Sequence, residues 1–75
     1  MTEKDRKIIE HAEKTGTPIF VLTAKDAASI QTLKDYRQHC KSIGSPESHT
    51  DGVTIRIFEF QDWELENKKK VKIPD

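Results

Sequence analysis

Residues 32–43 read TLKDYRQHCKSI, and this stretch decides the fold of the chain. Its apolar residues recur every three or four positions, which is the spacing of one face of an α-helix: Leu33, Tyr36, Cys40 and Ile43. Gly44 follows, and glycine readily takes the left-handed conformation that ends a helix. The sequence therefore predicts an amphipathic helix over residues 32–43.

This helix is expected to begin further upstream. Thr23 and Asp26 have the spacing of hydroxyl and acid that caps the N-terminus of a helix. The pattern predicts a start near Ala24, and Ala27 and Ile30 would continue the apolar face.

The N-terminal part predicts a helix followed by an extended segment. Residues 1–16 contain good helix formers and a closing Gly16, and form a peripheral helix with a narrow apolar stripe of Ile8, Ile9 and Ala12. Pro18 disfavours helical backbone in the residue before it. Residues 19–22 are the most hydrophobic point of the chain, and we expect them to be extended and held in the core.

The segment after Pro46 is ambiguous. A serine, a proline and an acid in succession at residues 45–47 predict a helix start. Val53, Ile57 and Phe60 have the spacing of a helix face, whereas Val53, Ile55 and Ile57 alternate as in a strand. As a helix, residues 47–66 would carry two apolar faces, with Ile55, Phe58 and Leu65 opposite the first set.

We therefore expect a mainly α, three-helix small domain that spans residues 1–75. It includes the short extended segment 19–22, with residues 71–73 as its candidate partner strand, and ends in a basic tail, residues 68–75. The helix of residues 32–43 would pack on the first face of the third segment. The alternative is an α+β fold in which residues 53–60 form a strand.

The composition limits the classes of function. The net charge is zero, so no overall field draws the chain to nucleic acid or to an anionic membrane. Hydrophobic residues make up only 33% of the chain, so a small core is expected to rest on the aromatic residues. The single cysteine allows no internal disulfide and no run is long enough to span a membrane, which favours a cytoplasmic, non-membrane protein.

No set of residues predicts catalysis or metal binding. His39 and Cys40 are neighbours, and neighbouring side chains on a helix point about 100° apart. Asp26 and Asp35 would lie about 13 Å apart along one helix, too far to share a proton. We expect no catalytic residue, no metal and no cofactor, and therefore no enzyme.

Two surfaces are candidates for binding. The second face of the third segment needs a cover, which a protein partner or a second copy would supply unless the first helix packs over it: Ile55, Phe58 and Leu65. The less favoured partner is nucleic acid, held by the helix 32–43 and the lysine tail: Lys34, Arg37, Lys41, Lys68, Lys69, Lys70 and Lys72.

Residues 18–75 resemble a group of small uncharacterised proteins of bacteriophages, prophages and other mobile elements. The resemblance is carried by the stretch PIFVLTAKD at residues 18–26, by the spacing of Thr32, Tyr36 and Trp63, and by the closing KVKIPD. It implies a bacterial accessory protein and a helical third segment, and it brings no catalytic residue. The expected function is protein binding without catalysis, and the alternative is a small DNA-binding regulator.

Overall fold

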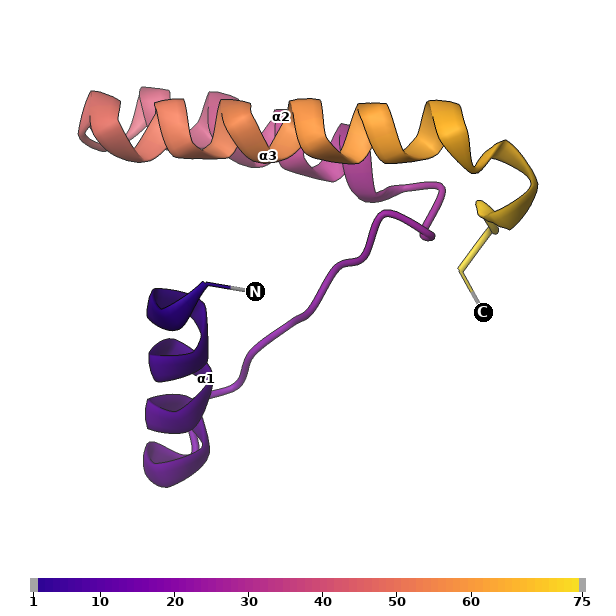
Figure 1. The fold of residues 1–75 in the computed structure, drawn as a ribbon. Coiled ribbons are helices and arrows are strands. Elements are labelled where there is room, and N and C mark those ends of the chain that lie inside the picture. The colour runs from indigo at the N-terminus through magenta and orange to yellow at the C-terminus, as the bar shows by residue number, and fades with distance from the viewer. Residues whose placement is uncertain (1, 75) are drawn as a thin grey trace.

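The computed structural model describes residues 2–74, and within them it is mainly helical. The elements are α1 (Glu3–Thr15), α2 (Ser29–Ser42), α3 (Glu47–Glu66) and the short 3-10 helix η1 (Lys68–Lys70) (Figure 1). The expected three-helix class is confirmed. Residues 53–60 lie inside α3, so a strand is not needed there, and Asp75 at the end of the expected tail lies outside the described residues.

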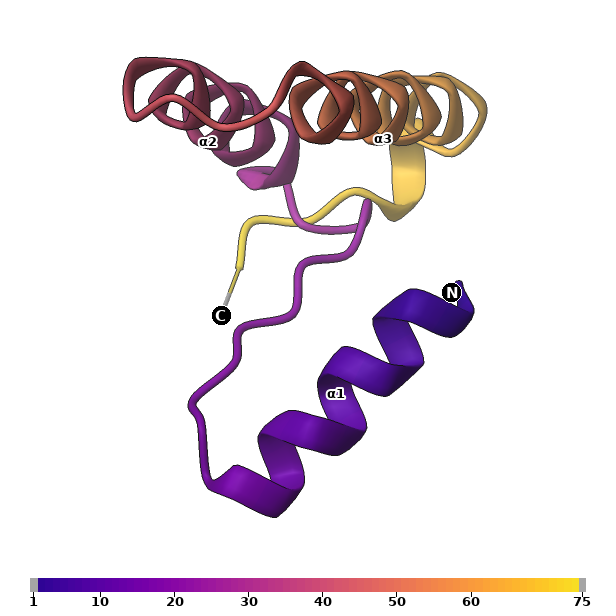
Figure 2. The same ribbon diagram turned by 90° about the vertical axis from the view of Figure 1, so that its left-hand side faces the viewer.

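The second and third helices form an antiparallel hairpin, as both views show (Figure 2). Gly44 takes the left-handed conformation after α2 with φ 85°, and the chain reverses before Glu47. Cys40, Val53 and Ile57 are buried between the two helices. The Arg37 guanidinium adds a polar contact, because its Nη1 donates to Thr54 Oγ1 at 3.0 Å.

The expected packing is only partly confirmed. Leu33 and Phe60 are half-buried, whereas Tyr36 and Ile43 are exposed. The expectation that the aromatic residues form the core is wrong. All five lie within residues 2–74, and each is exposed or half-buried. Small and β-branched side chains allow the hairpin helices to approach closely and fill the interface instead.

The start of α2 differs from the prediction, because Thr23–Asp26 forms a turn and the helix begins at Ser29. The Asp26 N–H donates to the Thr23 carbonyl at 3.1 Å. The Asp26 carboxylate accepts from Ala28 N at 2.7 Å, and the Asp26 carbonyl accepts from the Ser29 hydroxyl at 2.8 Å. The predicted capping box is therefore not formed: the N-cap of α2 is Ala28, which has no side-chain cap, and Asp26 instead stabilises the turn that precedes the helix.

The sequence suggests that residues 71–73 pair with residues 19–22. In the structure, the C-terminal segment pairs with the turn before α2 instead. Asp26 and Lys72 form a parallel bridge, in which Ala27 N donates to the Lys72 carbonyl at 2.8 Å and Lys72 N donates to the Lys25 carbonyl at 2.7 Å. Because the backbone of Lys25 and Ala27 is used in this pairing, these residues cannot continue α2 upstream. The lysine tail is thereby tied back to the body of the hairpin.

The first helix and the segment after it stand away from the hairpin as an arm, which we define as residues 3–22 (Figures 1 and 2). Thr2 and Asp5 form a capping box at the start of α1, and Gly16 closes it with φ 71°. Ala12 is the buried residue of α1. Residues 19–22 are extended, but the prediction that they lie in the core is wrong: Phe20 is 83% exposed, and Ile19 and Val21 are also exposed.

Candidate interaction surfaces

An apolar stripe runs along the outside of α3. Ile55, Phe58 and Leu65 are 57%, 58% and 67% exposed, and we call them the outer stripe. Their spacing of three and seven residues places them along one line of the helix. Val53 and Ile57, which face α2, lie on a different side. The two apolar faces expected for a helical third segment are therefore both present.

Exposed carboxylates border the outer stripe. Asp62 lies between Phe58 and Leu65 on the same line of the helix, one turn from each. The remaining acidic residues near this line are also exposed: Asp51, Glu59 and Glu66. The surface therefore combines a line of apolar side chains with negatively charged carboxylates, one of them within the line and the others beside it.

A second apolar surface lies on the arm, and it was not among the candidates predicted from the sequence. We call it the arm surface: Ile8, Ile19, Phe20 and Val21, all exposed. A hollow of about 600 Å³ separates the two parts of the arm, with Ile8, Ala12 and Ile19 among its lining residues. The hydrophobic run at residues 19–22 was the signal for it, but hydrophobicity alone predicts burial and not a surface.

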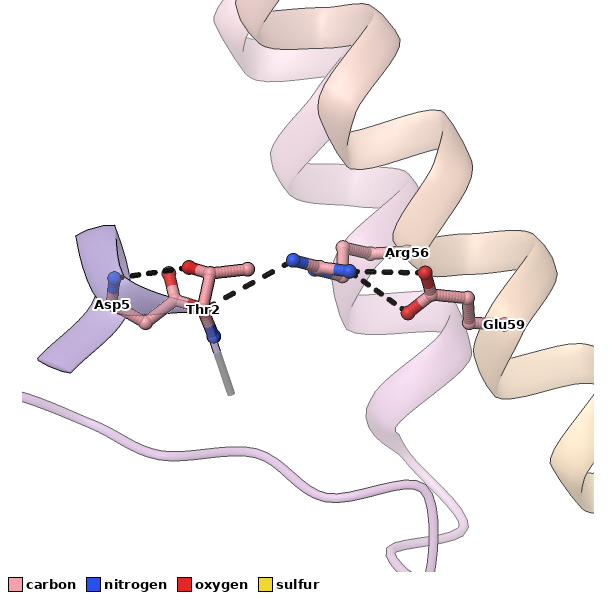
Figure 3. A network of polar contacts seen from close by, with 4 residues as sticks. All are labelled: Thr2, Asp5, Arg56 and Glu59. Carbon is pink, nitrogen blue, oxygen red and sulfur yellow. Dashed lines mark hydrogen bonds and ion pairs between the residues drawn. The ribbon is translucent and has the colours of Figure 1, made fainter.

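A polar contact links the arm to α3 (Figure 3). Arg56 Nη1 donates to both carboxylate oxygens of Glu59 at 3.0 and 2.9 Å, while Arg56 Nη2 lies 4.0 Å from Asp5 Oδ2. Hydrogen bonds from the side chain and backbone of Thr2, with a smaller contribution from Arg56, hold the pKa of Asp5 below its ordinary value. All these charged groups are exposed enough for water to screen them, so this link holds the arm weakly.

The histidines and the cysteine form no catalytic group. His39 and Cys40 do not act together: Cys40 is buried in the hairpin, while His39 is exposed. His49 instead meets Tyr36, whose hydroxyl lies 2.9 Å from His49 Nε2 with the rings edge to face. The neighbouring Cys40 thiol, and then burial, raise the pKa of the Tyr36 hydroxyl. Sequence spacing gave no sign of this pair, since it joins two helices.

The basic candidates do not gather on one surface. Arg37 is half-buried against Thr54, and Lys34 is half-buried as well. Lys41 lies in the last turn of α2, next to the start of α3, whereas Lys68–Lys70 follow the end of α3. The length of α3, about 30 Å, separates these two groups.

Residues 2–74 hold neither a metal-binding cluster nor a membrane-spanning helix. No three His, Cys, Asp or Glu side chains come close enough together in this part of the chain to hold a metal ion. None of the described helices combines the length and the apolar character needed to cross a bilayer.

Comparison with known proteins identifies no relative from which a function could be inferred. The chain matches no protein-family model, and no curated protein or solved structure shows significant similarity to it.

Proposed function

We propose that this chain is a protein-binding module without catalytic activity, and that its outer stripe binds an amphipathic helix of a partner protein. The observation that carries the proposal is the exposure of three large apolar side chains on one line of α3: Ile55, Phe58 and Leu65. Large exposed apolar residues that gather on one face are typical of interaction sites, and here Asp62 interrupts them between Phe58 and Leu65. The resemblance of residues 18–75 to proteins of phages and mobile elements suggests an accessory factor of such an element.

The spacing along the stripe favours a helix as the bound element. Residues 55, 58, 62 and 65 follow one another at intervals of three, four and three. This is the spacing at which the seam of a coiled coil meets a second helix. A partner helix with apolar residues at the same intervals would bury Phe58 at the centre of the contact.

The charge around the stripe favours a basic partner. Asp62 lies within the seam, and Glu59 and Glu66 lie beside it, in the flanking positions where helices form ion pairs. Lysine or arginine on the partner helix would complement them. The same carboxylates repel the phosphates of nucleic acid and of anionic lipids, which makes either a poor ligand for this face.

The test compares partner binding by the wild type and by Phe58→Ser. The tagged chain is used to purify partners from its native host, and the purified partner is then titrated into each variant by calorimetry. Truncating a side chain at the centre of an interface costs about 2 kcal/mol or more, so Phe58→Ser should weaken binding about thirtyfold. Phe20→Ser, which removes a comparable exposed aromatic from the arm, should leave the affinity unchanged.

The proposal also predicts the character of the partner. Its binding segment should be a helix with Lys or Arg beside its apolar line, and the affinity should fall as salt is raised. Partners that bind the wild type and Phe58→Ser equally well would refute the role of the outer stripe.

A further inference from the structure

We propose that residues 19–22 pair with the same residues of a second copy of this chain, as antiparallel strands about a two-fold axis, to form a homodimer. This inference concerns the arm surface and goes beyond the proposed function, which uses the outer stripe on α3. Each surface can therefore be tested while the other is left intact.

The first argument is the unpaired backbone of this segment. Residues 19–22 are extended, and their N–H and C=O groups form no hydrogen bond with any other residue from 2 to 74. Isoleucine, phenylalanine and valine favour strands. An exposed, unpaired hydrophobic strand readily pairs with another chain.

No other strand in the described part of the chain is paired with this segment. The hairpin of α2 and α3 is helical, and its backbone groups are used within the helices. In the other extended stretch, Lys72 is bonded to Lys25 and Ala27, which holds that stretch against the turn before α2 and not beside residues 19–22. Folding the arm down onto its own hairpin would bury the backbone of residues 19–22 without hydrogen bonds, which is costly. An identical segment from a second copy satisfies those groups, and a two-fold axis brings the two segments together in antiparallel order.

The side chains of this segment are placed to hold such a ribbon on both faces. Phe20 and Leu22 line a hollow of about 630 Å³ with Leu33 and Phe60 of the hairpin. Ile19 lines a hollow against α1, and all of residues 19–22 line a further hollow together with Ile8 and Ile9 of α1. A paired ribbon at this place would therefore have apolar side chains of α1 on one side and of the hairpin on the other. Two short strands are stable only when packed against other elements, and here helices lie on either side.

The second argument is the amount of surface that the chain leaves exposed. Its accessible area is 6238 Å², about 1,500 Å² more than the roughly 4,700 Å² expected for a compact chain of 8.6 kDa. Its radius of gyration is 13.7 Å, against about 11 Å for a compact domain of this length. The exposed side chains of the arm contribute to this excess, and pairing of residues 19–22 between two copies would bury part of it on each copy. The zero net charge puts no repulsion in the way of self-association.

The experiment measures the mass of the purified chain in solution by sedimentation equilibrium, together with amide hydrogen exchange. The wild type should have twice the chain mass of 8.6 kDa. Alternate amides of residues 19–22 should exchange slowly, and more slowly as the chain concentration rises. The double variant Phe20→Ser with Val21→Ser should weaken the dimer about a hundredfold or more.

The matched control is the double variant Ile55→Ser with Phe58→Ser, which removes the same kind of side chains from the outer stripe and should remain a dimer. Circular dichroism of each variant checks that the hairpin helices persist. A wild type that is monomeric at about 100 μM would overturn the proposal. Loss of the dimer in the control only, or fast exchange of residues 19–22 within a dimer, would also overturn it. None of these results bears on whether the outer stripe binds a partner helix.

Discussion

Replacement of Gly52 by alanine should stabilise the protein. Gly52 is the sixth residue of α3 and has ordinary helical backbone. Glycine in a helix interior is less favourable than alanine by about 0.8–1.0 kcal/mol, because it loses more conformational freedom on folding. A β-carbon added at Gly52 meets no heavy atom within 4 Å, so no steric cost offsets this gain.

The effect is large enough to measure by urea unfolding, followed by circular dichroism at a fixed chain concentration. A domain of this size has an unfolding slope of about 1 kcal/mol per molar urea, so the midpoint should rise by about 1 M. The melting temperature should rise by about 4–8 °C.

Gly44→Ala is the matched control for this prediction. Its β-carbon also meets nothing within 4 Å, but Gly44 has φ 85° at the end of α2. A residue with a side chain is disfavoured there by about 1–2 kcal/mol, so the same substitution should destabilise the protein. If Gly52→Ala lowers the urea midpoint, residues 47–66 do not form the continuous helix on which the hairpin and the outer stripe depend.

Two further predictions concern the core and the arm. Ile57 is 2% exposed, so Ile57→Ala should cost about 2–5 kcal/mol in urea unfolding, whereas Ile55→Ala on the outer stripe should change stability by less than about 1 kcal/mol. Equal costs would place Ile55 in the core. The lowered pKa of Asp5 means that its contribution to α1 is complete above its unfolded pKa of about 3.9 and is lost as the pH falls through the lower folded value. The NMR chemical shifts of residues 3–6 should therefore move toward coil values below about pH 4, and Asp5→Asn should abolish that transition.

The helical class and most helix positions follow from local patterns. The apolar spacing of residues 32–43 and the glycines at 16 and 44 predict where α1 and α2 end, because these signals act within one or two turns. Local patterns predict a helix end wrongly where a residue distant in sequence takes the backbone hydrogen bonds. The start of α2 was placed too early because Lys72, far along the chain, takes the backbone of Lys25 and Ala27.

The residues of the outer stripe could be predicted from their helical spacing, but whether the first helix covers them could not, and the structure leaves all three exposed. The arm surface could not be predicted, since Ile19 and Phe20 have the hydrophobicity of core residues. Whether they are buried depends on where α1 and the hairpin lie around them. The Tyr36–His49 and Arg37–Thr54 contacts likewise join side chains from different helices.

The sequence by itself predicted a mainly helical chain, the ends of its first two helices, and two apolar faces on residues 47–66 if that segment is a helix. These properties arise from hydrogen bonds and side-chain spacing within a few residues. Only the tertiary structure decided that the most hydrophobic segment lies on a projecting arm, and that residues 25–27 pair with Lys72. Burial and long-range pairing depend on how separate elements pack, and no local pattern encodes that packing.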